Sequence, residues 1–312
     1  SIGSIVAPDM EARGYSKRFT GSIIAASGLL GIIIPPSIPY IMYCNASGAS
    51  ISELFLAGFL PGVLNALCLM VYSYIYCKIH GEDKDKLNAK CMELRAKGLG
   101  TVLKEGFWAL MSPVIILGGI YGGICSPTEA ATISIFYSLI VSLFIYRTIK
   151  IRDLPKIMLE GIHSYAPILI ILSAAVAFAR VITLMNVATI VSEAVLSAIS
   201  SKVVILLLIN VLLLFVGMIM DTGPAILVFT PVLLPVAEAI GVDPIHFGII
   251  MCVNLAIGFV TPPMGANLFV ASNLSKVSVF DIARKAVPFI LAFLIALLLI
   301  TFVPQISMFL LQ

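Results

Sequence analysis

Two pairs of consecutive prolines lie inside long apolar runs of this sequence, in GIIIPPSIPY at 31–40 and in GFVTPPMGAN at 258–267. Proline has no backbone N–H, so within a helix it leaves the carbonyl group four residues earlier without its usual partner. The first pair would free the carbonyls of Gly31 and Ile32 in this way. Each stretch therefore predicts a broken helix that presents backbone oxygens.

The second stretch repeats this pattern at the carbonyls of Gly258 and Phe259. In hydrocarbon an unsatisfied carbonyl costs on the order of several kcal/mol, and irregular backbone persists only where it is packed in protein or lines a cavity. Sodium ions are suitable partners, because unwound carbonyls coordinate them in transporters with broken helices. The alternative is a structural kink whose carbonyls are bonded by Ser, Thr or water. Two copies at one internal spacing favour the ion-binding interpretation.

The composition indicates a polytopic membrane protein built from helices. The 312 residues are 60% hydrophobic and 11% charged, with a mean hydropathy of +1.11. Such values lie far outside the range of an average soluble domain. Apolar stretches long enough to enter or cross a bilayer recur at 59–77, 107–124, 129–146, 164–184, 203–220, 246–275 and 286–310.

The basic residues predict the orientation of these spans. If segment 78–106 is cytoplasmic, as the positive-inside rule suggests, counting spans places 13–18, 147–156 and 276–285 on the same side. These loops hold every Lys and Arg except Arg180 and Lys202. We therefore interpret these basic loops as determinants of the chain's orientation in a lipid bilayer, and we expect no nucleic-acid partner.

An internal repeat relates the two proline pairs. A shift of 227 residues aligns both pairs and several further positions: Pro8 with Pro235, Glu11 with Glu238, Gly14 with Gly241, Gly21 with Gly248, Gly31 with Gly258 and Pro61 with Pro288. The basic loop 13–18 has a partner at 240–246 without Lys or Arg, which predicts inverted repeats. Inverted repeats with interrupted spans indicate a secondary transporter whose site lies near the bilayer midplane.

The stretch 203–239 runs apolar on both sides of Asp221, Thr222 and Gly223. It is long enough for two full spans. Counting it as one re-entrant hairpin instead keeps loop 276–285 on the same, cytoplasmic side of the membrane as the other basic loops. We expect Asp221 to cap the returning arm and also to lie near a cation. By the repeat, a matching hairpin is expected before residue 1, with SIGSIVAPDM as its returning arm, so we expect the native chain to begin earlier.

Three other polar residues need an interpretation. Arg180 and Asn254 have two alternative roles each, and Glu129 has one. Arg180 could attract a carboxylate or extend to the outer interface. Asn254 could line the site or bond between helices. Glu129, in SPTEAA, is expected to cap a helix. The six cysteines and three histidines show no metal-ligand spacing, so no transition metal and no cofactor are expected.

The stretches AASGLLGIIIPPSIPY, SPTEAA and GMIMDTGPAILVFTPVLLPVAEAIGVDPIHFGIIMCVNLAIGFVTPPMGANLFVAS together resemble the large, DctM-like membrane subunit of tripartite ATP-independent periplasmic (TRAP) transporters. The resemblance covers essentially the whole chain. It implies an all-α, inverted-repeat elevator transporter of the ion transporter superfamily, with re-entrant hairpins and two broken helices. The implied domains are transport 1–50, mainly scaffold 51–200, transport 201–275 and scaffold 276–312.

The resemblance also implies the site residues. One sodium site would use Gly31, Ile34 and Pro36, and the other Gly258, Thr261 and Pro263 with Asp221, Thr222 and Gly223. The solute would lie between them. Its expected contacts are Ser37, Arg180, Asn254, Met264 and Gly265.

The implied function is sodium-coupled uptake of an organic carboxylate, either sialic acid or a C4-dicarboxylate, across a bacterial inner membrane. Sodium would be the coupling ion. A periplasmic binding protein would deliver the solute, with segment 45–53 as a possible contact. A small membrane subunit, separate or fused ahead of this chain, would complete the complex.

Three alternatives differ in what they require. A stand-alone sodium/dicarboxylate symporter would need no binding protein. A non-transporting assembly subunit would have no use for two costly helix breaks and a buried acid. An intramembrane enzyme would need paired aspartates, HExxH or a Ser–His pair, and the sequence shows none of these. We therefore expect a transporter and not an enzyme.

Overall fold

The computed structural model describes residues 2–80, 92 and 98–311, and within these residues every regular element is a helix. Six of the helices are long and apolar enough to cross a membrane, and two further bent pairs qualify as broken spans. The prediction of an all-α polytopic membrane protein is confirmed. Much of the basic loop 78–106, including Lys84, Lys86 and Arg95, lies outside the described residues.

The chain forms two compact units, one of Ser1–Asp83 with Ala175–Gln312 and the other of Lys84–Ala174. The smaller unit pairs α7 (Leu99–Tyr121) with α8 (Pro127–Ile140) and continues through a π-helical turn, Val141–Ile145, into the first part of α9 (Leu154–Leu184). Ser126 and Glu129 form a capping box at the start of α8, which confirms the role predicted for Glu129.

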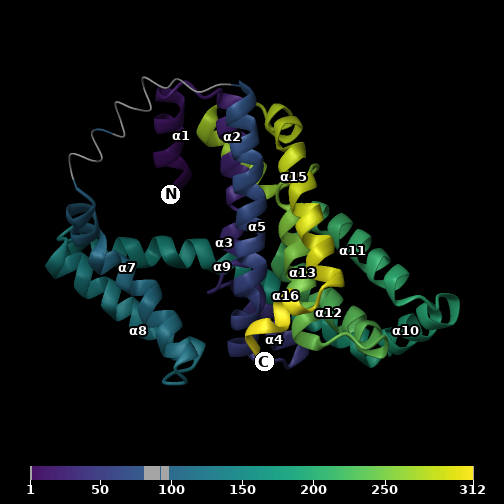
Figure 1. Cartoon of the computed structure of the whole chain (residues 1–312). Helices are drawn as coiled ribbons and strands as arrows, with labels where there is room; N and C mark the ends of the chain where they lie inside the picture. The colour runs from purple at the N-terminus through teal and green to yellow at the C-terminus, as the bar shows by residue number, and fades with distance from the viewer. Residues whose placement is uncertain (1, 81–91, 93–97, 312) are drawn as a thin grey trace. The chain divides into compact units, whose positions relative to one another are not determined.

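The larger unit contains all the elements of the repeat (Figure 1). Its first half comprises α1 (Ile2–Ala12), α2 (Lys17–Ser27), α3 (Leu30–Ile33), α4 (Ile38–Ser47) and α5 (Ile51–His80). Its second half comprises α10 (Val187–Ala198), α11 (Lys202–Ile219), α12 (Thr222–Ala239), α13 (Pro244–Gly258), α14 (Ala266–Ser275), α15 (Val279–Phe302) and α16 (Gln305–Met308).

Helix α13 forms the core of this unit. Every residue from 245 to 258 is buried, and the helix contacts α4, α5, α11, α12 and α15. Its sequence, PIHFGIIMCVNLAIG, is apolar on nearly all faces, as expected for a helix enclosed by others. The second broken helix is therefore fixed at the centre of the packing.

The backbone confirms the repeat. Helix α2 begins at Lys17 and α13 at Pro244, its equivalent by the 227-residue shift, and the two helices are capped by the equivalent residues Ser16 and Asp243. The equivalent Gly14 and Gly241 both have left-handed backbones, with φ of 92° and 71°. The glycines and prolines of the repeat thus preserve backbone geometry.

The repeat partners α5 and α15 contact each other and run in opposite directions (Figure 1). Helix α5 leads away from α4, whereas α15 leads back toward that end, where α16 lies. This arrangement agrees with the inverted topology that the charge pattern predicted.

Two elements differ from the prediction. The last span was expected to run to 310, but α15 ends at Phe302 because Pro304 follows, and a short helix, α16, comes next. Helix α10 was not predicted as a separate element. It is separated from α9 by Asn186, which has a φ of 54°, and the two helices meet at 62°. The arms α11 and α12 each have 18 residues, so their length alone fits both a re-entrant hairpin and two spans.

A buried chain of hydrogen bonds joins three helices of this unit. The Asn254 amide of α13 donates to Asn210 Oδ1 of α11 at 2.6 Å, and the Asn210 amide donates to Thr301 Oγ1 of α15 at 3.0 Å. All three side chains are at most 3% exposed. Buried polar groups that bond across helices hold the register of the helices that carry them.

We expect Asn210→Leu to destabilise the larger unit by roughly 1–3 kcal/mol, because the buried Asn254 amide and Thr301 hydroxyl each lose a hydrogen-bond partner on another helix and keep only a carbonyl of their own helix. Unfolding can be followed with a thiol-reactive dye, since Cys44 and Cys252 are buried free cysteines of this unit. The midpoint temperature of labelling should fall clearly below that of the wild type.

Asn65→Leu is the matched control. Asn65 is also fully buried, but its amide bonds only to the Pro61 carbonyl of its own helix, and its Oδ1 has no partner. The control should lower the midpoint less. A midpoint for Asn65→Leu that falls as far as that for Asn210→Leu would contradict a register-holding role for the network.

Candidate functional site

The second helix break is a compact turn whose freed carbonyls are bonded again. Helix α13 ends at Gly258, and α14 starts at Ala266. The Thr261 N–H donates to the Gly258 carbonyl at 3.0 Å, and the Asn267 N–H donates to the Phe259 carbonyl at 3.1 Å. The expectation that these two carbonyls lack protein partners is wrong, because the chain folds back and brings donors from later residues.

The first break uses a side chain for the same purpose. After α3, the Ser37 hydroxyl donates to the Ile32 carbonyl and is 2% exposed. At Ile32 the structure therefore shows the alternative interpretation, a structural kink whose carbonyl is bonded by a serine. The hydroxyl expected to contact solute is engaged within the turn.

A carbonyl oxygen that accepts one hydrogen bond keeps a second lone pair. At the second break two carbonyl oxygens lie close to Gly265. A Cβ atom added at Gly265 would lie 2.9 Å from the Phe259 carbonyl oxygen, 3.1 Å from that of Thr261 and 2.9 Å from Leu268 Cδ1. Two carbonyl oxygens beside a residue without a side chain could serve as ligands of a small cation.

The α11–α12 hairpin packs directly on this turn. A Cβ atom added at Gly258 would lie 2.2 Å from the Gly217 carbonyl carbon, so the backbones of α11 and α13 touch. The Met264 N–H donates to the Met218 carbonyl at 3.1 Å. The structure thus brings the end of α11 against turn 259–265. The hairpin residues that the resemblance assigns to a sodium site, Asp221, Thr222 and Gly223, follow directly after α11.

The hairpin tip is held by a cap, as predicted. Asp221 Oδ1 accepts from the Thr222 N–H at 2.9 Å, while its side chain remains exposed. Thr222 is buried, and a Cβ atom added at Gly223 would lie 3.0 Å from Met42 Sδ of α4. The tip therefore lies between the second break and the helix that follows the first break.

The first set of predicted ligands is more dispersed. Ile34 packs on α5, because a Cβ atom added at Gly62 would lie 2.7 Å from Ile34 Cγ1. Gly31 lines a cavity of about 490 Å³ together with Gly28 and Asn267, and an added Cβ would meet nothing within 4 Å. Open space thus surrounds the Cβ position of Gly31, whereas its repeat equivalent, Gly258, packs against the backbone of Gly217. The position equivalent to Gly217 falls before residue 1.

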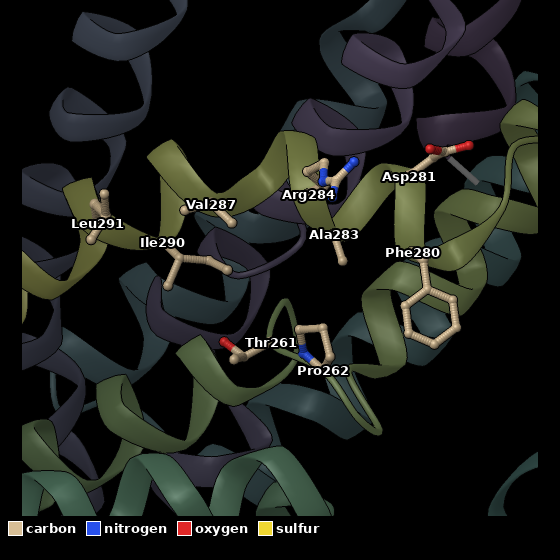
Figure 2. A pocket seen from close by; sticks show the side chains of 9 residues that line it. All are labelled: Thr261, Pro262, Phe280, Asp281, Ala283, Arg284, Val287, Ile290 and Leu291. Atoms are coloured by element: carbon tan, nitrogen blue, oxygen red, sulfur yellow. The ribbon is translucent and has the colours of Figure 1, made fainter.

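A cavity of about 600 Å³ borders the second break (Figure 2). Thr261 and Pro262 form one wall, and α15 forms the other. Its lining from α15 is Phe280, Asp281, Ala283, Arg284, Val287, Ile290 and Leu291. Figure 2 shows the Phe280 and Ala283 side chains pointing to the side on which Pro262 lies, while the Asp281 carboxylate points the other way.

Of the predicted solute contacts, Met264 and Gly265 lie in the second turn beside Thr261. Asn254 is fully enclosed in the network with Asn210, so the predicted interhelical bond is present and solute contact would require the side chain to become exposed. Arg180 is exposed on α9, and no hydrogen bond or ion pair links it to either turn within the described part of the chain.

Sequence reasoning missed Arg284 as a cavity residue. Its position in the basic loop 276–285 suggested only a topology signal. The available clue was its spacing, four residues after Phe280 and three before Val287, which places all three near one face of a helix.

Residues 1–306 match the family described as the DctM component of the tripartite ATP-independent periplasmic transporter. The isethionate TRAP transporter permease protein DctMQ of Oleidesulfovibrio alaskensis is 44% identical over 99% of this chain, which spans 48% of that protein. The chain thus spans about half the length of that relative.

Two further relatives are large permease proteins of which the chain covers 71%. They are the C4-dicarboxylate TRAP transporter protein DctM of Pseudomonas aeruginosa, 37% identical, and the sialic acid TRAP transporter protein SiaM of Vibrio cholerae, 34% identical, each over 99% of this chain. Such permeases are transporters rather than enzymes. The two broken helices, the inverted repeat and the match over residues 1–306 together show that this multi-pass membrane chain belongs to the DctM family of TRAP transporter large permeases.

Proposed function

We propose that this chain carries the sodium-binding and solute-binding elements of a permease for small organic anions. The observation that carries the proposal is the second break, where the Phe259 and Thr261 carbonyls converge beside Gly265 and the α11–α12 hairpin packs on the same turn. A cation bound there would hold the hairpin and the turn together. Sodium binding would thus order the surface that receives the solute.

The chemistry of the relatives supports an anionic solute. Their names specify a C4-dicarboxylate, sialic acid and isethionate, which bear carboxylate or sulfonate groups. The resemblance stated above implied the two carboxylates, and the 44% identical relative adds a sulfonate. We therefore propose a solute with at least one such group, bound near Met264 and Gly265.

The remaining parts of the proposal concern the assembly. The word tripartite in the family description supports two further components, which we propose to be a small membrane subunit and a periplasmic binding protein. A periplasmic transporter implies residence in a bacterial inner membrane. Alternating access would occur by an elevator movement of the hairpin and the two breaks.

The deciding experiment is uptake into proteoliposomes that hold the complete complex. Labelled isethionate, succinate and sialic acid are tested with and without an inward sodium gradient and the binding protein. Uptake of one of them that requires both supports the proposal. Uptake that needs sodium alone supports a stand-alone symporter, and no uptake of any anion in a complex that binds its partners supports an assembly subunit.

Gly265→Ala tests the carbonyl site. The new Cβ would lie 2.9 and 3.1 Å from the two carbonyl oxygens that are proposed to bind the cation, and 2.9 Å from Leu268 Cδ1. We expect the sodium concentration for half-maximal uptake to rise roughly tenfold or more, in line with the loss of support at a metal site. Gly106→Ala is the matched control, because an added Cβ there meets nothing within 4 Å. An unchanged sodium dependence in the folded Gly265→Ala variant would place the cation elsewhere.

Asp221→Asn separates the cap from the charge. Asparagine caps helices about as well as aspartate, so the thermal midpoint should stay near that of the wild type. If the carboxylate lies near the cation, the half-saturating sodium concentration should rise several-fold at unchanged stability. Asp221→Ala, which loses both features, should lower the midpoint as well. A half-saturating sodium concentration in Asp221→Asn equal to that of the wild type would show that Asp221 acts only as a helix cap.

A further inference from the structure

The cavity between α15 and the second break has one charged corner and otherwise apolar walls (Figure 2). Val287 and Leu291 of its lining are 47% and 56% exposed. Exposed apolar side chains on a membrane-spanning helix contact lipid chains. The cavity is therefore continuous with a surface that faces hydrocarbon.

Arg284 supplies the positive charge of this cavity. The neighbouring acid, Asp281, pairs with Arg18 at 3.6 Å. Arg284 is exposed, and within the described residues it has no ion pair. Because the Asp281 charge is already matched, Arg284 remains available to an external anion.

The rest of the lining offers almost no hydrogen-bond donors. The Thr261 hydroxyl donates to the Ile257 carbonyl at 2.9 Å, so its proton is already used. A small polar anion such as a dicarboxylate would lose its hydration here without compensation. A ligand with one anionic group and a long apolar chain fits the walls better.

The charge pattern identifies the source of such a ligand. Arg284 lies at the end of α15 near Lys276 and Lys285, on the side that the positive-inside count makes cytoplasmic. Basic pockets beside membrane helices on this side attract anionic lipid headgroups. We propose that one anionic phospholipid occupies the cavity, with its phosphate on Arg284 and an acyl chain along Val287 and Leu291.

The position of the cavity gives this lipid a contact with the site. Its far wall is Thr261 and Pro262, in the turn whose carbonyls converge on Gly265. The acyl chain therefore packs against the second break. A change in the turn alters the volume available to the lipid, and the lipid in turn restrains the turn.

Quenching of a single tryptophan tests the proposal. The reporter is Leu291→Trp within the complete complex, in which Trp108, the one tryptophan of this sequence, and every tryptophan of the other components are replaced by phenylalanine. The protein is reconstituted in vesicles of phosphatidylcholine with brominated phosphatidylglycerol, or the reverse. At equal mole fraction, brominated phosphatidylglycerol should quench about fivefold more effectively, the preference expected from one basic side chain at an anionic surface.

Adjacent substitutions with the same charge change provide the control. Arg284→Gln should abolish the preference, whereas Lys285→Gln should leave it, because the Lys285 ammonium lies over the Tyr76 ring at 4.6 Å from its centroid.

Three outcomes would overturn the proposal. The first is equal quenching by both brominated lipids, and the second is a preference that survives Arg284→Gln. The third is reversal of the quenching by millimolar isethionate, succinate or sialic acid, which would make the cavity a solute site. None of these outcomes depends on sodium-coupled uptake, so the result stands apart from the proposed function.

Discussion

The absence of water in the bilayer core imposes the constraint on which this structure depends, because every peptide group there needs a partner within the protein. The two proline pairs violate the helical solution to that constraint, and the fold restores it locally. At the first break Ser37 bonds the Ile32 carbonyl, and at the second the backbone N–H groups of Thr261 and Asn267 return to the carbonyls of Gly258 and Phe259. Restoring these bonds bends the chain into a turn in which oxygens converge.

The convergence is useful only because another element closes on it. Gly217 and Gly258 allow the backbones of α11 and α13 to touch, and any side chain at either position would separate the hairpin from the turn. Small residues at helix crossings serve this purpose in membranes, where apolar surface alone gives no preference between protein and lipid. The Asn210, Asn254 and Thr301 network then fixes the register of the same helices.

The sequence predicted those features that depend on backbone identity. Glycines and prolines recur with the 227-residue shift because few other residues adopt their conformations, so the repeat and both breaks could be found without a structure. The caps at Asp221 and Glu129 were predictable for a similar reason, since each bonds a neighbour in sequence. The partners of the freed carbonyls could not be predicted, because the N–H groups of Thr261 and Asn267 reach them only through the three-dimensional turn. Arg284 was missed because charge counting gives a basic residue a side of the membrane but not a neighbour.

Asn267 shows why the two breaks should be considered together. Its backbone N–H bonds the Phe259 carbonyl of the second break, and its side-chain amide donates to the Ala25 carbonyl of α2, close to the first break, at 3.1 Å. An atom added at Gly28 would also collide with that amide. A displacement of the second turn must therefore either carry α2 with it or break this bond. An unpaired amide and an unpaired carbonyl at membrane depth are costly, so we expect the two breaks to move together as one body.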